Sequence, residues 1–346
     1  MADVTTFTST QILAISTGSP EKLYTILNLK LEYRQLASKW HPDRNNDTDA
    51  ESVFKHIKTL YEKAEEKIEK GLWNGPSEVT FVSSDNTTYR FKYLRIHELE
   101  IGKMYIGKTK LLYVIEPDFE DLFRNGIKMM GLIKYPSPKY EEQFKRQMPN
   151  IVKSVKADIG FCVVMEKTED LVLLKDLLEY MPDGKLPMVH TAWLLSTLCN
   201  LACFIEMNKI AHGAISPDTF WITPKYHSGV LLGGWWYARP NGDKLIALPQ
   251  ESLAILPSKI FVDKLAKSEY DRTLIKTIGL ECLGDKSKTG STLLKDKTVP
   301  PQILSWLRSP SAKNAVEEYK RWADVRDDGL GPRKFVELNV NIDEIY

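Results

Sequence analysis

The chain has 346 residues, of which 43% are hydrophobic and 27% charged, and its formal net charge at pH 7 is +1. This composition is ordinary for a soluble globular protein with two or three domains. The nearly balanced charge argues against a protein that coats nucleic acid, so we expect no nucleic-acid partner.

Cysteine content and the apolar segments bear on the compartment. The cysteines form no CxxC pair and have apolar neighbours, which predicts buried thiols in a reducing compartment and no metal site. The N-terminal stretch MADVTTFTST lacks the basic region and apolar core of a secretory signal. The most apolar long segment, residues 192–207, is too short to span a bilayer. We therefore expect a cytoplasmic protein with no membrane partner. The cysteines are Cys162, Cys199, Cys203 and Cys282.

The chain begins with a predicted pair of helices after a short one at residues 9–14. Ser19, Pro20 and Glu21 supply a capping hydroxyl, a proline at the first helical position and an early acid, so a helix is expected from Pro20 to Trp40. Pro42 must end it, because proline lacks an N–H and restricts the residue before it.

This second helix has an apolar side and a basic side. Its apolar residues recur at helical spacing, while Lys30, Arg34 and Lys39 lie off that stripe. Residues 50–70 carry a similar stripe, as expected for an antiparallel partner helix. The apolar residues of the two helices are Leu29, Tyr33, Leu36, Ala37 and Trp40, then Phe54, Ile57, Tyr61, Ala64 and Ile68.

The helix-loop signature YRQLASKWHPDRN and the helix AESVFKHIKTLYE resemble the J-domain of DnaJ-type co-chaperones over about residues 8–73. The resemblance implies docking on a DnaK-type heat-shock chaperone. The loop that contains His41, Pro42 and Asp43, the HPD loop, would stimulate the ATPase of that chaperone. Ala14 replaces a usual glycine, and Leu31 and Gln35 replace frequent basic residues. The implied chaperone-binding residues are His41, Pro42, Asp43, Tyr33, Arg34, Lys30, Lys39 and Arg44.

Residues 71–77, GLWNGPS, are typical of a hinge. Neither a Gly/Phe-rich linker nor a cysteine-rich zinc module follows, which indicates a specialised co-chaperone whose second part selects the client. The alternating β-prone runs between residues 79 and 115 predict an antiparallel sheet.

Further landmarks then follow in order. A strand at 131–135 with Lys134, a polar helix from Pro138, a strand at 161–165, and helices at 173–180 and 190–208 are predicted. The segments HGAISPDT at 212–219 and VLLGGW at 230–235 come next. This order resembles a two-lobed protein-kinase-like fold over about residues 79–323.

On that resemblance, Lys134 matches the lysine that pairs with nucleotide phosphates, and Glu141 or Glu142 matches its helical partner. An exposed lysine or a structural ion pair with either glutamate is the competing interpretation. Gly102 and Gly107 keep the spacing of the outer glycines of a nucleotide-binding loop, whose middle glycine is replaced by Met104.

The downstream chemistry of the kinase family is replaced. On the resemblance, Ala214 replaces the aspartate that acts as base, and Ser216 replaces the lysine of the catalytic loop. Thr219 replaces the metal-binding asparagine, and Gly233 replaces the aspartate of the DFG motif. We therefore expect a pseudokinase that is not an enzyme and has no catalytic residues, no metal and no cofactor. Weak ATP binding through Lys134 is compatible with a pseudokinase. His212 is expected to be a buried histidine that anchors its loop.

The sequence thus predicts an α+β protein with a J-domain at 1–73, a linker at 74–78, a kinase-like domain at 79–330 and a tail at 331–346. The tail is expected to be strand-like and to dock either on the body or on a partner. Its expected function is a co-chaperone whose kinase-like body holds an unknown client protein. One alternative is an atypical kinase or nucleotide-binding enzyme in which Asp218 or Asp243 replaces the lost acids. Another is a structural module that engages no chaperone.

Overall fold

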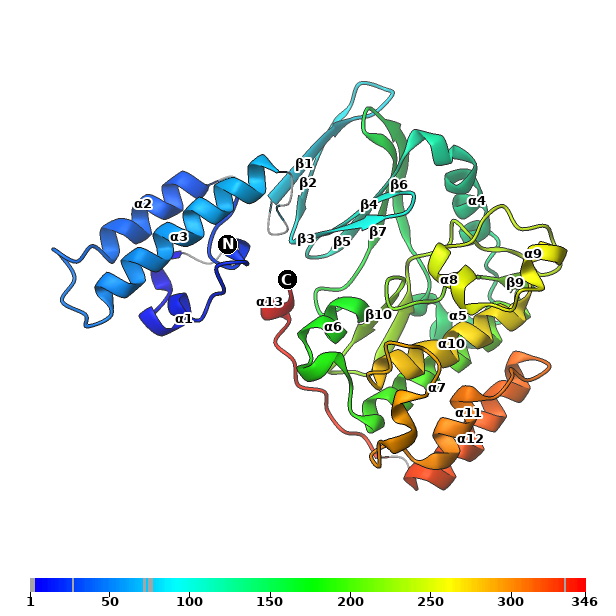
Figure 1. Cartoon of the computed structure of the whole chain (residues 1–346). Helices are drawn as coiled ribbons and strands as arrows, with labels where there is room; N and C mark the ends of the chain where they lie inside the picture. Colours follow the sequence, from blue (N-terminus) through cyan, green and yellow to red (C-terminus); the bar gives the residue numbers. More distant parts are fainter. Residues whose placement is uncertain (1–3, 27, 71–72, 74–76, 333) are drawn as a thin grey trace. The chain divides into compact units, whose positions relative to one another are not determined.

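The computed structural model describes residues 4–26, 28–70, 73, 77–332 and 334–346 (Figure 1). The chain divides into two compact units. One comprises residues 1–114, 152–164 and Tyr346, and the other residues 115–151 and 165–345. The first contains an N-terminal helical region and an antiparallel sheet, and the second is mainly helical, so the predicted α+β class is confirmed.

The N-terminal region is built around two antiparallel helices. Its helices are α1 (Ser9–Leu13), α2 (Leu29–Lys39) and α3 (Ala50–Glu69), with single 3-10 turns at Val4–Thr6 and Pro20–Lys22. The third helix agrees with the prediction. The second was predicted too long, since only a 3-10 turn forms at Pro20 and the α-helix begins nine residues later.

Glu32 accounts for the late start of α2. Its buried carboxylate accepts hydrogen bonds from the backbone N–H of Thr25 at 2.6 Å and from the Thr25 hydroxyl at 2.8 Å. These bonds hold the chain before the helix in a non-helical turn and satisfy a backbone donor there.

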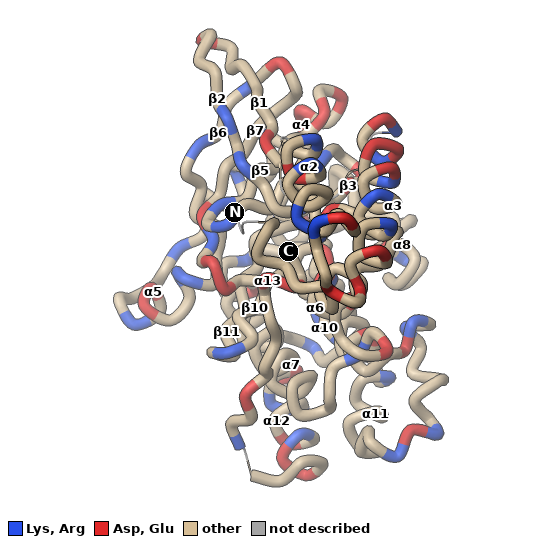
Figure 2. Tube along the Cα trace, turned by 90° about the vertical axis from the view of Figure 1, so that its left-hand side faces the viewer, with Lys and Arg blue, Asp and Glu red and all other residues tan. Residues whose placement is uncertain are grey.

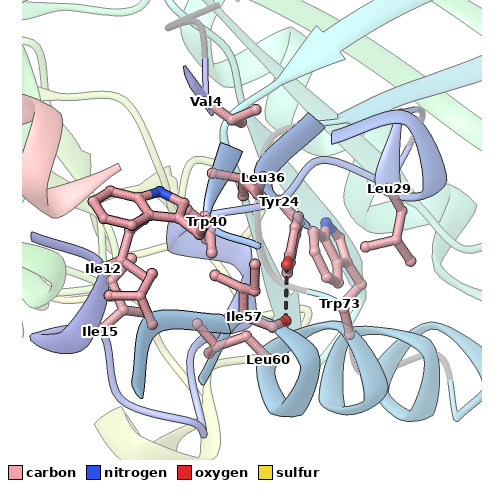
Figure 3. Packing of buried hydrophobic residues seen from close by; sticks show 13 residues of the cluster. Val4, Ile12, Ile15, Tyr24, Leu29, Leu36, Trp40, Ile57, Leu60 and Trp73 are labelled. Atoms are coloured by element: carbon pink, nitrogen blue, oxygen red, sulfur yellow. Dashed lines mark hydrogen bonds between the residues drawn. The ribbon is translucent and has the colours of Figure 1, made fainter. Parts of the chain in front are cut away.

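The helical region has a hydrophobic core of its own, shown in Figure 3. The Tyr24 hydroxyl donates a buried hydrogen bond to the Ile57 carbonyl at 2.8 Å. Trp73, which follows α3, is 7% exposed and belongs to this core. The buried members are Val4, Ile12, Ile15, Leu23, Tyr24, Leu29, Leu36, Trp40, Val53, Ile57, Leu60, Ala64 and Trp73.

The predicted hinge at residues 71–77 falls mostly outside the described residues. Strand β1 (Ser77–Val82) begins within the predicted linker and pairs antiparallel with β2 (Thr88–Tyr93). A five-stranded sheet has the order β3-β4-β5-β7-β6. Its strands are β3 (Arg95–Leu99), β4 (Gly102–Ile106), β5 (Lys110–Ile115), β6 (Ile151–Ala157) and β7 (Gly160–Glu166).

A second core joins the β1–β2 hairpin to this sheet. Phe81 and Phe91 of the hairpin cluster with Leu112, Val114 and Cys162 of the sheet. The alternation of side chains along each strand places one face of the hairpin on one face of the sheet.

The helices of the second unit are α4 (Glu120–Gly131), α5 (Pro138–Phe144), α6 (Leu174–Tyr180), α7 (Met188–Met207), α8 (Gln250–Ile255), α9 (Ile260–Asp263), α10 (Ser268–Cys282), α11 (Pro301–Arg308), α12 (Ala315–Leu330) and α13 (Ile342–Ile345). Its short strands are β8 (Val172–Leu173), β9 (Ile210–Ala211), β10 (Phe220–Thr223), β11 (Ser228–Leu231) and β12 (Arg239–Pro240), with β8, β10 and β11 in one sheet.

Helix α7 is the central helix of this unit and packs against α10 and α12. The Trp322 indole N–H donates to the Ser196 hydroxyl at 2.8 Å. Within the described part of the chain, α7 alone has the length and apolar composition to cross a membrane, and 61% of its most apolar window is buried. The helix predicted at residues 190–208 forms as α7, which begins two residues earlier, at Met188, and is longer than the apolar segment 192–207 that was expected to be too short to span a bilayer.

The C-terminal tail lies on the second unit. Residues 334–341 form neither a helix nor a strand, and the tail ends in the short helix α13, so the strand predicted for it does not form. Leu338 and Ile345 are buried, and the Tyr180 hydroxyl of α6 donates to the Glu344 carboxylate at 2.9 Å.

The strand predicted at residues 131–135 is absent. Gly131 ends α4, and residues 133–135 form a loop before α5. The sequence analysis missed α4, although Leu122, Met129 and Met130 form a buried helical stripe and two acids occupy its first turn.

Because Trp73 closes the N-terminal core, Trp73→Ala should destabilise a fragment of residues 1–77 by about 3–5 kcal/mol. Urea unfolding followed by circular dichroism measures the change. Ser52→Ala, on the exposed side of α3, is the matched control and should unfold at the wild-type midpoint. Equal midpoints for Trp73→Ala and wild type would exclude Trp73 from the core.

Candidate functional site

The first candidate site is the loop between α2 and α3. Helix α2 ends at Trp40, whose N–H donates to the Leu36 carbonyl at 2.9 Å, and Pro42 prevents a further turn. The N–H groups of Arg44 and Asn45 both donate to the His41 carbonyl at 2.9 Å, which closes the loop tightly. The Asn45 side-chain amide also donates to the Lys39 carbonyl at 3.0 Å.

His41 and Asp43 present different faces of this loop. The Asp43 side chain is 86% exposed, whereas the His41 side chain is 43% exposed and its ring lies edge-on to Phe54 at 5.4 Å. The Asp43 N–H donates to His41 Nδ1 at 3.2 Å, so this ring nitrogen acts as the acceptor. The loop thus offers an exposed carboxylate whose oxygen lies 3.8 Å from Nδ1 of an oriented imidazole.

The basic side chains near the loop differ in whether hydrogen bonds hold them in place. Lys30, Arg34 and Arg44 are exposed. The Lys39 ammonium donates to the carbonyls of Thr5 at 2.7 Å and Phe7 at 2.9 Å, so it ties the N-terminal segment to α2. This structural use of Lys39 was not predicted.

Tyr33 also has a structural contact. Its ring stacks on that of Tyr61 with centroids 4.3 Å apart, which joins α2 to α3. Charges of both signs follow one another along α3 (Figure 2), where Glu51 pairs with Lys55 and Glu66 with Lys70. Such i,i+4 pairs stabilise a solvated helix face.

The second candidate site is the segment 212–219 in the helical unit. The Asp271 carboxylate of α10 accepts from the N–H groups of His212 at 2.8 Å and Gly213 at 2.6 Å. His212 Nε2 donates to the Gly233 carbonyl at 3.1 Å, and Nδ1 accepts from the Ala214 N–H at 3.3 Å. His212 is fully buried and anchors the loop, as expected.

Burial sets the protonation of both anchors. It raises the pKa of Asp271 to about 7, against the opposing effect of the two backbone N–H donors. It lowers the pKa of His212 to about 3, which keeps the ring neutral. The role of Asp271 was not predicted, since an acid in the first turn of a helix is ordinary.

The other residues that the sequence analysis compared with kinase catalytic residues form contacts close to this segment. The Thr219 hydroxyl donates to the Ala214 carbonyl at 2.8 Å and accepts from the Ser216 N–H at 2.9 Å. A Cβ added at Gly233 would lie 2.9 Å from the Thr219 Cα, so the backbone packs too closely there for any side chain. Asp218 pairs with Lys175 at 2.7 Å.

The tryptophans after Gly234 form a buried corner. Trp235 and Trp236 are buried, and the Trp235 indole donates to the Leu231 carbonyl at 2.9 Å. The Asn125 amide of α4 donates to the carbonyls of Trp236 at 2.9 Å and Ala238 at 2.8 Å. Asn125 therefore fixes this segment against a helix that the sequence analysis missed.

The arrangement predicted around Lys134 does not form. Lys134 is exposed in the loop after α4, where its backbone N–H donates to the Asn208 side chain at 2.8 Å. Glu141 pairs with Lys145 at 2.8 Å, and Glu142 is exposed. A strand lysine facing a helical carboxylate is thus missing at these positions, because residues 131–135 continue from a helix.

The predicted glycine loop is also misplaced. Gly102 begins β4 and Gly107 follows its end, so the two glycines flank a strand. The turn between β3 and β4 contains Glu100 and Ile101, and Ile101 is buried. A Cβ at Gly107 would lie 2.9 Å from two backbone carbonyls, which explains this glycine by close packing.

A family model for the DnaJ domain matches residues 11–69. The chain is 34% identical over 64 residues to the chaperone protein DnaJ of Mycoplasmoides gallisepticum (strain R(low / passage 15 / clone 2)). This match covers 18% of the chain and 15% of that relative, so the chain spans a small part of the relative's length.

Two solved structures resemble most of the chain. Vaccinia related kinase 3 matches with a TM-score of 0.53 and 13% identity over 75% of this chain and 93% of that chain. The Toxoplasma gondii specific rhoptry antigen kinase domain gives a TM-score of 0.49 and 11% identity over 77% of this chain and 90% of that one.

The prediction that the chain is not an enzyme is wrong. It rested on replaced residues, whereas the similarity to vaccinia related kinase 3 gives the body the fold of an enzyme class. At 13% identity this similarity carries the fold and assigns no catalytic residue. Residues 11–69 thus form a DnaJ domain, and the rest of the chain has a protein-kinase-like fold.

Proposed function

We propose that this protein is a specialised co-chaperone. Its DnaJ domain stimulates the ATPase of a DnaK-type heat-shock chaperone, and its kinase-like body holds a client or partner protein. The observation that carries the proposal is the exposed HPD loop on a two-helix hairpin with its own core.

The geometry of the loop supports contact through Asp43. A carboxylate with 86% of its side chain exposed forms a charge-assisted hydrogen bond with a partner's arginine or lysine at little cost in reorganisation. His41 and Pro42 fix the direction of this carboxylate, because the His41 ring packs on Phe54 and Pro42 ends α2.

The exposed cations of α2 supply the second part of the interaction. Lys30 and Arg34 lie one turn apart and are solvated, so they attract an acidic chaperone surface. Lys39 contributes its charge from a fixed position on the Thr5 and Phe7 carbonyls.

We take residues 1–73 as the functional domain, because the helical core closes at Trp73. We also propose a cytoplasmic location. The free thiols of Cys162, Cys199, Cys203 and Cys282 support it, since free cysteines persist in a reducing compartment.

The first test is stimulation of a DnaK-type ATPase by residues 1–77. His41→Gln or Asp43→Asn should abolish stimulation and leave the helical content unchanged, because neither side chain belongs to the core. Steady-state ATP hydrolysis is the measurement. Asp49→Asn makes the same chemical change at an exposed residue of the same loop that forms no side-chain cap, and it should stimulate like wild type. Full stimulation by Asp43→Asn would refute the role of the loop.

The second test concerns steering. Exposed charges are screened over about 10 Å at 0.1 M ionic strength, so association with the chaperone should slow as salt rises. Arg34→Ala should reduce that salt dependence, while Lys58→Ala on α3, which pairs with Glu62, should preserve it. Stopped-flow association at several salt concentrations measures both. A salt-independent wild-type rate would remove the steering contribution.

The third test concerns nucleotide. Because Lys134 is exposed in a loop, Lys134→Met should leave the affinity for ATP unchanged, whatever its wild-type value. Calorimetric titration with and without magnesium gives the affinity, and Lys139→Met on α5 is the matched exposed control. If Lys134→Met lost ATP binding and Lys139→Met did not, Lys134 would belong to a nucleotide-binding site.

A further inference from the structure

The helical unit contains a groove that the sequence analysis did not predict. It has a volume of about 960 Å³ and lies between the 3-10 turn at Thr292–Lys295, the following loop and helix α11. This volume is within the range of ligand-binding clefts, roughly 300–1,000 Å³. The groove lies wholly within residues 293–309.

The floor of the groove is apolar. Leu293, Val299 and Leu304 are buried beneath it, whereas Leu294 stands at its edge with 60% of its surface exposed. An exposed leucine beside an apolar floor provides a site for large apolar side chains of a partner.

The rim of the groove is cationic. Lys295, Lys297 and Arg308 line it and are exposed, and none of them forms an ion pair with any residue that the structure describes. Arg308 uses only its Nε, which donates to the Thr289 carbonyl at 3.2 Å. Lysine and arginine positions beside α11 are visible in Figure 2.

The single acid of the rim is already engaged. The Asp296 carboxylate accepts from the Thr298 N–H at 2.9 Å and the Thr298 hydroxyl at 2.7 Å, and these bonds lower the pKa of Asp296. Three exposed cations and one hydrogen-bonded anion therefore line the groove.

We propose that this groove binds an acidic segment of a partner protein that carries large apolar side chains. The cations pair with its carboxylates, and the apolar residues of the segment cover Leu294 and the floor. A single-stranded nucleic acid fits less well, because the lining contains no aromatic side chain on which bases stack. The proposal rests on the client-holding role proposed above and names the class of client.

The test uses the full chain and a short fluorescein-labelled peptide of alternating pairs of Glu and Leu, followed by fluorescence anisotropy. The double variant Lys295→Glu, Lys297→Glu should weaken binding at least about fivefold and reduce its salt dependence. Leu294→Ser should weaken binding at constant salt dependence. All three positions are exposed, so the fold is retained.

Lys139→Glu on α5 is the matched charge-reversal control and should bind like wild type. A peptide with Ser in place of Leu should bind weakly, as should one with Lys in place of Glu. Equal binding by wild type and both groove variants, or displacement of the peptide by an oligouridine at equal concentration, would overturn the proposal. The chaperone is absent from this assay, so its outcome is independent of the ATPase test.

Discussion

The buried carboxylate of Asp271 is the constraint on which the helical unit depends. By accepting two successive backbone N–H groups, it joins α10 to the segment that begins at His212. His212 then bonds to Gly233, and the tryptophans after Gly234 are fixed to α4 by Asn125. A buried acceptor without these donors would cost several kcal/mol, so the helix and the segment must form together.

Burial also couples this anchor to pH in two opposite directions. The folded-state pKa of Asp271 is raised from 3.8 to about 7, so its contribution to stability is lost as pH rises through that interval. The folded-state pKa of His212 is lowered from 6.5 to about 3, so its contribution is lost as pH falls through that interval. The two contributions oppose one another between about pH 4 and 6.5, which flattens the pH dependence of stability there.

Local signals predicted the DnaJ hairpin, because the stripes of α2 and α3 and the stop at Pro42 are written in adjacent residues. They failed where distant contacts decide. The turn before α2 depends on the Glu32 carboxylate, and Lys39 is fixed by carbonyls more than thirty residues away in the sequence. The lysine site failed for another reason: Lys134 matches a family pattern, but the helical stripe of α4 ends at Gly131 and leaves residues 131–135 off any strand.

The same contrast explains why residue replacement was a poor guide to the body. Gly233 and Thr219 were interpreted by the side chains that they lack, whereas the structure explains them by what they do: the backbone at Gly233 packs on Thr219, and the Thr219 hydroxyl closes the loop on Ala214. These contacts stabilise the loop without any of the replaced side chains. The surfaces left for binding are therefore those whose polar groups have no structural use, and the HPD carboxylate, Lys295 and Lys297 are examples among the described residues.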